Sequence, residues 1–173
     1  RSDTYPKGRT TTGYYLRKYL DESHTDFSVI KVSTQTWVEL RLAEIYLIRA
    51  EANYRLGASG AALEDVNAVR QRPGVNLPAL SGLSGNDLFK AIRQERKIEL
   101  AYEGHRYWDI RCWKRADRED NGNRVHCLKI MPQHEYVDCD LQDRKFLAKT
   151  YVFPIPYDEL ANNSAIEQYD EWK

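Results

Sequence analysis

The chain has 173 residues, of which 42% are hydrophobic, so it is long enough to bury a core of its own. Its 26 basic residues balance its 26 acidic residues, which removes the electrostatic reason to expect nucleic acid or an anionic membrane surface as a partner. No apolar run approaches the roughly 20 residues that a membrane-spanning helix needs. We therefore expect a single domain over residues 1–173, with a helical region at about 36–115 and an irregular region at 116–173.

The helical region begins with a capping pattern. Thr36 is followed three residues later by Glu39, which predicts a first helix from Trp37 to about Leu56, ended by Gly57. Three further helices are expected at about residues 60–70, 86–104 and 106–114.

The irregular region contains turn signals and short apolar stretches, which indicate a loop or hairpin. Within "PYDEL", Pro156 and the acidic residues after it predict a short C-terminal helix. The cysteines are odd in number, namely Cys112, Cys127 and Cys139, so two can pair if the protein is exported, whereas all three stay reduced in a cytosol. We expect a Cys127–Cys139 bridge, because a segment poor in regular structure gains from a covalent staple.

The first two predicted helices have the spacing of a tetratricopeptide hairpin. "AEANYRLG" followed by "GAALEDVNAVRQRPG" carries the small and aromatic residues of such a unit and a proline near its end. A single unit cannot cover its own apolar face, so we expect it to pack on further helices, including helices outside this chain.

Two predicted helices place carboxylates among apolar side chains. On a helical wheel of the third helix, Glu95 and Glu99 fall in the middle of the apolar face and Glu103 lies at its edge. Glu44 and Glu51 fall within the apolar arc of the first helix. The apolar positions themselves are Leu40, Ala43, Leu47 and Tyr54 in the first helix, and Leu88, Ala91, Ile92, Ile98 and Tyr102 in the third.

A buried carboxylate without a partner is costly, and the planar fork of arginine suits a carboxylate well. We therefore interpret these residues as a structural charge network, made of Arg41, Glu44, Glu51, Glu95, Glu99, Glu103, Arg106 and Asp109. The alternatives are the acid and base of a glycoside hydrolase or a metal site. No sequence feature marks a catalytic cleft, and neither a Glu-x-x-His motif nor a close cysteine pair is present. We predict no catalytic residue, no cofactor and no metal.

Four blocks of the sequence resemble a known family. They are "RLAEIYLIRAEANYRLG" with "ALEDVNAVRQRPG", then "ERKIELAYEGHRYWDIRCWKR", then "YVFPIP", and finally "NNSAIEQYDEW". In this order, and within about residues 13–172, they are similar to the C-terminal part of SusD/RagB-like proteins, the glycan-binding outer-membrane lipoproteins with which Bacteroidetes use starch and other polysaccharides. Cys112 stands where the family commonly has an arginine.

The resemblance implies a mainly α fold of tetratricopeptide-like helix hairpins with long irregular excursions and a few short strands. It implies a non-enzymatic, surface-exposed nutrient-binding protein, anchored through a lipidated N-terminal cysteine that this chain lacks, with a SusC-like TonB-dependent transporter as its partner. Family members bind oligosaccharides, and their helical repeats serve mainly as scaffold and as docking surface. The chain has no initial methionine and matches only the C-terminal part of the family, so we expect it to be a piece of a longer protein.

The residues that would contact a glycan are not implied by the resemblance, because the family's sugar platform comes largely from earlier segments. Tyrosines in the polar N-terminal stretch are the candidates, since their rings offer flat amphipathic area to a sugar; they are Tyr14, Tyr15 and Tyr19. The alternative function is a tetratricopeptide-type module for protein–protein interaction.

Overall fold

The computed structural model describes residues 16–22, 35–120, 124–130, 136–143 and 145–173, and in the stretch 120–143 it describes the backbone only. The described residues fall into two compact units, residues 16–106 and residues 107–173. The predicted single domain remains a prediction.

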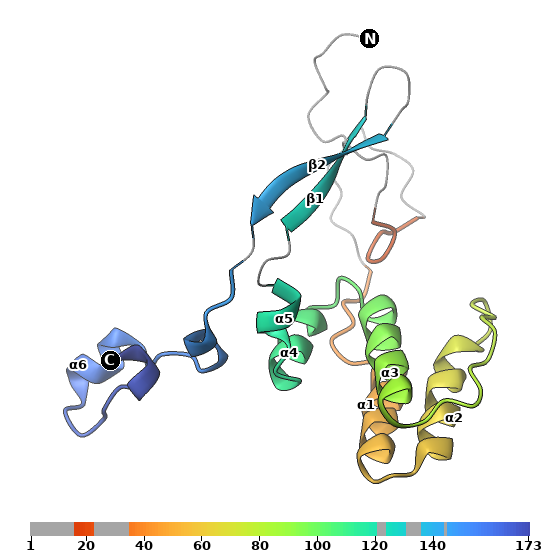
Figure 1. Ribbon diagram of the computed structural model, residues 1–173, viewed down its shortest axis with the longest axis horizontal. Helices are drawn as coiled ribbons and strands as arrows, with labels where there is room; N and C mark the ends of the chain where they lie inside the picture. Colours follow the sequence, from red (N-terminus) through yellow and green to blue (C-terminus); the bar gives the residue numbers. More distant parts are fainter. Residues whose placement is uncertain (1–15, 23–34, 121–123, 131–135, 144) are drawn as a thin grey trace. The chain divides into compact units, whose positions relative to one another are not determined.

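Three helices build the first unit, namely α1 (Leu42–Arg55), α2 (Ser59–Arg70) and α3 (Gly85–Glu99), and they pack side by side (Figure 1). The helices α1 and α2 form an antiparallel hairpin. Gly57 lies in the turn between them with φ of 79°, a left-handed conformation that glycine adopts without the steric cost of a side chain. The predicted mainly α fold with a tetratricopeptide-like hairpin is confirmed.

The core of this unit is aliphatic and lies between the three helices. Its largest fully buried side chains are Leu47 of α1, Val66 and Val69 of α2, and Leu88 and Ile92 of α3. Of the apolar positions predicted from helical spacing, Leu47, Leu88 and Ile92 are fully buried.

The start of α1 differs from the prediction. The helix begins at Leu42, and Arg41 is its N-cap, with an extended backbone and no capping hydrogen bond from its side chain. The capping box predicted at Thr36 is therefore wrong. Trp37 and Leu40, expected in or beside the apolar face, precede the helix and are each 64% exposed.

The end of α3 also differs. The helix ends at Glu99 and not at Gly104, and Tyr102 leaves helical geometry with φ of 66°. Ile98 is 61% exposed and Tyr102 is 74% exposed, so the prediction that both complete the apolar face of this helix is wrong. Leu100, the C-cap of α3, is the residue that enters the core in their place.

The second unit contains short elements. The helix α4 (His105–Cys112) begins at the end of the first unit, and it is followed by α5 (Ala116–Asp120), β1 (Arg124–Ile130), β2 (Tyr136–Asp143), the 3-10 turn η1 (Ala148–Tyr151), α6 (Tyr157–Asn162) and the 3-10 turn η2 (Asp170–Trp172). The predicted fourth and C-terminal helices correspond to α4 and α6, whereas α5 was not predicted.

Side-chain contacts fix the end of this unit. The side-chain amide of Gln168 both accepts from the backbone N–H and donates to the carbonyl of Ile155, and the indole N–H of Trp172 donates to the carbonyl of Val152 at 2.8 Å. These bonds join side chains near the C-terminus to backbone groups of Val152 and Ile155, which have no partner within a helix or strand.

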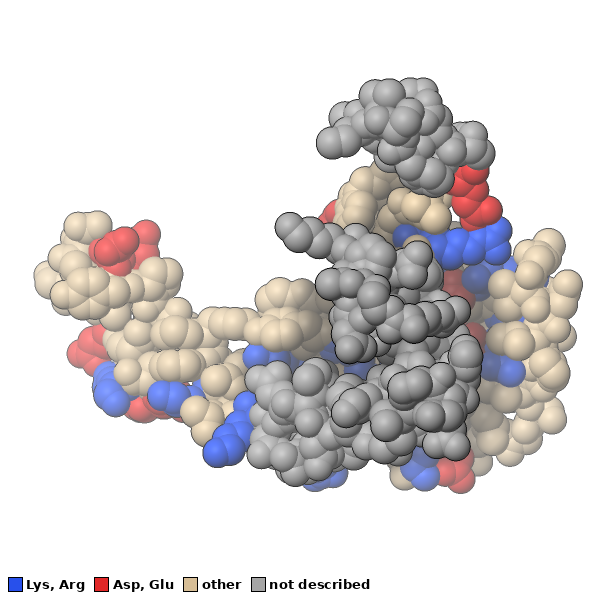
Figure 2. Space-filling model, turned by 90° about the horizontal axis from the view of Figure 1, so that it is seen from above, with Lys and Arg blue, Asp and Glu red and all other residues tan. Residues whose placement is uncertain are grey.

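Within the described residues, none of the helices combines the length and the apolar character needed to cross a membrane. Figure 2 shows basic and acidic side chains interspersed among the described residues on the face that it draws. This mixture agrees with the formal net charge of zero.

The strands β1 and β2 form an antiparallel two-stranded sheet in which Cys127 is the register partner of Cys139. Directly opposite residues in such a ladder have Cα atoms about 4.5–5.5 Å apart, which lies within the range that a disulfide bridges. This is a property of the backbone register, since the side chains of the hairpin lie outside the described residues.

We accordingly expect Cys127 and Cys139 to form a disulfide when the protein is purified under oxidising conditions. Non-reducing proteolysis followed by mass spectrometry should recover the two peptides joined, with Cys112, an exposed free cysteine, as the internal control for an unpaired thiol. Recovery of Cys127 and Cys139 as free thiols in such material would refute the pairing.

Candidate functional site

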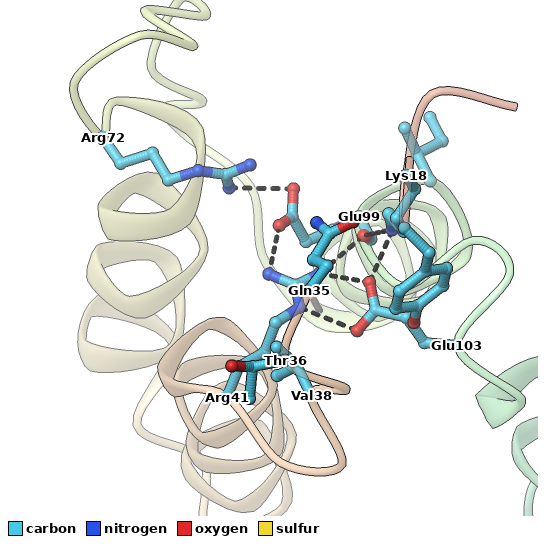
Figure 3. Close-up of a pocket in the computed structure, with 10 residues that line it drawn as sticks. Lys18, Gln35, Thr36, Val38, Arg41, Arg72, Glu99 and Glu103 are labelled. Carbon is cyan, nitrogen blue, oxygen red and sulfur yellow. Dashed lines mark hydrogen bonds and ion pairs between the residues drawn. The ribbon is translucent and has the colours of Figure 1, made fainter. Parts of the chain in front are cut away.

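A pocket of about 410 Å³ opens on the first unit, where the start of α1, the residues after α2 and the end of α3 meet (Figure 3). Its wall is mostly charged and polar, with two apolar side chains and one aromatic ring. The lining residues are Lys18, Tyr19, Gln35, Thr36, Val38, Arg41, Arg72, Ile98, Glu99 and Glu103.

Arg41 is the centre of the charged wall. Its Nε donates to Glu103 Oε2 at 2.7 Å and its Nη2 donates to Glu103 Oε1 at 2.8 Å, so the guanidinium grips that carboxylate with both prongs. The other nitrogen, Nη1, donates to Glu99 Oε1 at 2.6 Å. Arg41 is the N-cap of α1, Glu99 is the last residue of α3 and Glu103 lies four residues further on, so this one side chain ties the two helices together.

Two further cations complete the network. Arg72, just beyond α2, forms an ion pair with Glu99 in which its Nη1 lies 2.8 Å from Oε2, so each oxygen of that carboxylate has its own arginine. The ammonium of Lys18 donates to a carboxylate oxygen of Glu103 and to the carbonyls of Glu99 and Ala101, at 3.0 and 2.8 Å. Lys18 thereby satisfies carbonyls that the end of a helix leaves without an intrahelical partner, and its charge is favourable at that pole.

The network is largely shielded from water. The side chains of Glu103 and Glu99 are only 7% and 10% exposed, against 27% for Arg41. Burial raises the pKa of Glu103, but the hydrogen bonds and charges of Arg41 and Lys18 outweigh it and hold that pKa below its usual value. The pKa of Arg41 is raised, chiefly by its hydrogen bond to Glu103. Both partners therefore stay charged at neutral pH.

The other residues predicted for the charge network lie outside this pocket. Glu95 pairs with Arg70 of α2 at 2.8 Å, and the buried Glu44 lies 3.4 Å from Nδ1 of His105. Glu51 pairs with Arg55 one turn along the same helix. Arg106 and Asp109 both lie half-buried in α4, apart from the pocket wall. The structure thus distributes the predicted carboxylates over several contacts, and their common structural role stays a prediction.

Three partners were not found from the sequence, namely Lys18, Arg72 and His105. Lys18 lies in a stretch without periodicity, and 81 residues separate it from Glu99, so no local pattern links them. Arg72 could have been found from the sequence. It lies two residues beyond the helix predicted at about 60–70, and the next predicted helix, at 86–104, carries the carboxylates that need partners.

Of the three tyrosines predicted as glycan contacts, the structure describes one. Tyr14 and Tyr15 lie outside the described residues. Tyr19 lines the pocket and stacks on Trp37, with ring centroids 4.7 Å apart and planes inclined by 19°. Tyr19 has φ of 67°, a left-handed conformation that is unusual for a residue other than glycine, and the chain turns at this residue. The stacked pair is a flat aromatic surface beside a polar wall.

The chemistry of the pocket is that of saturated ion pairs. Both oxygens of Glu99 and of Glu103 already lie against cationic groups, which leaves little affinity for a further cation. Within the part of the chain that the structure describes, no three His, Cys, Asp or Glu residues are grouped as a metal site requires.

Comparison with known proteins gives the family. A family model described as "SusD family" matches residues 2–172. SusD-like protein P2 of Formosa agariphila is 31% identical over 139 residues, covering 76% of this chain, and SusD-like protein P25 of the same organism is 37% identical over 78 residues, covering 44%. A crystal structure of a SusD-like protein from Bacteroides fragilis superposes with a TM-score of 0.70 at 34% identity over 76% of this chain.

The chain is short beside these relatives. It spans 25% of the length of SusD-like protein P2, 15% of SusD-like protein P25, and 25% of the Bacteroides fragilis chain. The likeness therefore covers most of this chain and a minor part of each relative.

The pocket yields a stability prediction. Replacing Glu99 by glutamine should lower the free energy of unfolding by about 2–3 kcal/mol, because a carboxamide removes the charge that faces Arg41 and Arg72 and turns an N–H₂ donor toward one of them. Urea denaturation followed by circular dichroism measures the loss.

The matched control is Asp87→Asn in the same helix. Asp87 is 71% exposed and pairs with Lys90 one turn away, a contact worth no more than about 0.5 kcal/mol. Equal, small effects of the two substitutions would contradict the anchoring role of Glu99.

Proposed function

Because the chain belongs to the SusD family, we propose that it is part of a non-enzymatic protein that binds oligosaccharides at the outer membrane of a bacterium and takes part in nutrient uptake. The observation that carries this proposal is the family match, which extends over residues 2–172 and leaves almost none of the chain unaccounted for. The proposal transfers a family activity, so it needs the test given below.

Within that protein, we assign this chain chiefly the role of scaffold and docking surface. The charged wall of the pocket supports this, because its carboxylates are held by Arg41, Arg72 and Lys18 and are not presented to a ligand. A catalytic pair needs one carboxyl group that keeps its proton near neutral pH, and the lowered pKa of Glu103 argues against that role for it.

We propose that Tyr19 and Trp37 make a minor contribution to glycan binding. Trp37 is 64% exposed, and a flat aromatic face next to polar side chains is a surface on which sugar rings pack. An isolated stack of this kind gives weak binding, since an oligosaccharide needs several such contacts to offset the loss of its own freedom.

The partner we propose is a SusC-like TonB-dependent transporter, which the binding protein would cover. Attachment to the cell surface would come from a lipidated N-terminal cysteine outside this chain.

The alternative function, a tetratricopeptide-type interaction module, is favoured by the α1–α2 hairpin alone. The two differ in what co-purifies from membranes: a TonB-dependent transporter in the first case, and a peptide-bearing protein in the second.

The proposal predicts a difference between the complete protein and this chain. In isothermal titration calorimetry against a panel of oligosaccharides, the protein encoded by the complete gene should bind one class with micromolar affinity and release no cleaved sugar. The isolated 173 residues should bind that class at least about tenfold more weakly, because they span only 25% of the length of SusD-like protein P2.

Two results would contradict the proposal. Micromolar binding by the isolated chain would show that its own surface is the main glycan site. Hydrolysis of the sugar by the complete protein, detected as new reducing ends, would show an enzyme.

A further inference from the structure

Arg111 of α4 lies among aromatic rings of the second unit. Its guanidinium carbon is 3.8 Å from the centroid of the Tyr107 ring. The ring centroids of Phe146 and Phe153 are 4.9 and 5.7 Å from the same atom. Each of these distances lets the positive charge interact favourably with the electron-rich face of the ring.

This guanidinium lacks a counter-ion. Among the residues that the structure describes, Arg111 has no carboxylate partner, and its buried Nε has no hydrogen-bond acceptor. Two carboxylates of the same unit are used elsewhere, since Glu119 pairs with Arg115 at 2.9 Å and Asp117 accepts from the phenol of Tyr151 at 2.6 Å. A cation that rings shield from water attracts an anion more strongly than a fully hydrated cation does.

The rings beside Arg111 are themselves accessible. Tyr107, Trp108 and Phe153 are 45%, 56% and 51% exposed. Trp108 meets Tyr107 edge to face, with ring centroids 5.1 Å apart, and its centroid lies 5.9 Å from that of Phe153. The three rings therefore form one aromatic surface next to a cation.

We propose that Arg111, Tyr107, Trp108 and Phe153 form a binding site for a sugar residue that carries a carboxylate, such as a hexuronate within an acidic oligosaccharide. The carboxylate accepts from the Nη groups of the guanidinium, whose planar fork matches its two oxygens. The apolar face of the sugar ring packs on the exposed aromatic rings. The inference rests on the proposed function, because it names the class of oligosaccharide that the protein binds.

The combination of a cation with flat rings favours this ligand over two others. A neutral sugar would leave the guanidinium without a counter-ion and would cover it further from water, which is costly. An acidic peptide would supply the charge, but its backbone N–H and C=O groups would also need partners. The contacts described around the guanidinium are aromatic side chains, which suit a sugar ring better than a peptide backbone.

The test uses the protein encoded by the complete gene and ligands that differ in one group. Isothermal titration calorimetry compares oligomers of galacturonate, mannuronate and glucuronate with their methyl esters. Maltohexaose serves as a neutral sugar, and a carrageenan oligosaccharide carries sulfate without carboxylate. We expect one uronate oligomer to bind with micromolar affinity and its methyl ester to bind at least about tenfold more weakly, because esterification removes the charge and keeps the sugar ring.

A pair of variants assigns the charge to this site. Arg111→Gln should lower the affinity for the uronate oligomer at least about tenfold and leave the affinity for the methyl ester within about twofold. The matched control is Arg118→Gln, because Arg118 is an exposed arginine of α5 in the same unit and its replacement removes the same formal charge. The control should leave both affinities unchanged.

A third variant tests the site even if Arg111→Gln does not fold, which circular dichroism would show. Trp108 is more than half exposed, so its ring can be removed with little loss of packing. Trp108→Ala should weaken the binding of the uronate oligomer at least about threefold, because the sugar ring loses an aromatic contact.

The other results would overturn the proposal. Equal losses from Arg111→Gln and Arg118→Gln, or unchanged binding by Trp108→Ala, would place the acidic sugar elsewhere. Binding of the carrageenan oligosaccharide but of no uronate would make the ligand a sulfate ester. Binding of neutral sugars alone would remove the carboxylate and leave the proposed function standing, whereas binding of no oligosaccharide would contradict the proposed function and this inference with it.

Discussion

The first unit depends on one guanidinium group. Arg41 stands at the start of α1 and reaches two carboxylates at the end of α3, and Arg72 and Lys18 approach the same carboxylates from beyond α2 and from residues 16–22. Buried carboxylates of like charge, four residues apart, would repel each other and favour protonation if they had no such partners. The constraint is therefore mutual, since the carboxylates require the arginines and the arginines hold three helices at one end.

This arrangement explains how the glutamates that line the pocket hold the three helices in position. The aliphatic core supplies the burial that holds α1, α2 and α3 together, but aliphatic packing alone does not fix how far one helix slides along another. Directional bonds from a planar fork do fix it. Further along the helices, Arg49 pairs with Asp65, and Arg70 pairs with Glu95, so α2 is tied to both neighbours as well.

The sequence predicted the inner faces better than the ends of the helices. Leu47, Leu88 and Ile92 were located because helical periodicity persists through each helix interior. The start of α1 was misplaced because Thr36 and Glu39 satisfy the capping pattern, although the helix begins only after Arg41, whose side chain lines the pocket. Tyr102 was misassigned because the wheel was continued past Glu99, where the helix stops. Ile98 lies within the last turn of α3 but is 61% exposed.

The partners in the site were predictable only in part. The need for arginines followed from the buried carboxylates, and Arg41 and Arg70 were available on adjacent predicted helices. Lys18 was not predictable, since its contacts depend on how a segment without periodicity returns to the end of α3. Which polar side chain meets which carboxylate is set by packing between distant parts of the chain, and no local pattern in the sequence encodes it.

The most direct test of this account is a double-mutant cycle between Arg41 and Glu103. Urea unfolding would be measured for Arg41→Leu, Glu103→Leu, the double variant and the parent chain. If this pair holds α1 to the end of α3, the double variant should lose less stability than the two single losses added together, by about 2 kcal/mol or more. Each single variant leaves the other member of the pair without its partner, whereas the double variant removes both members. Losses that add to within about 0.5 kcal/mol would contradict the account, because the two residues would then act independently.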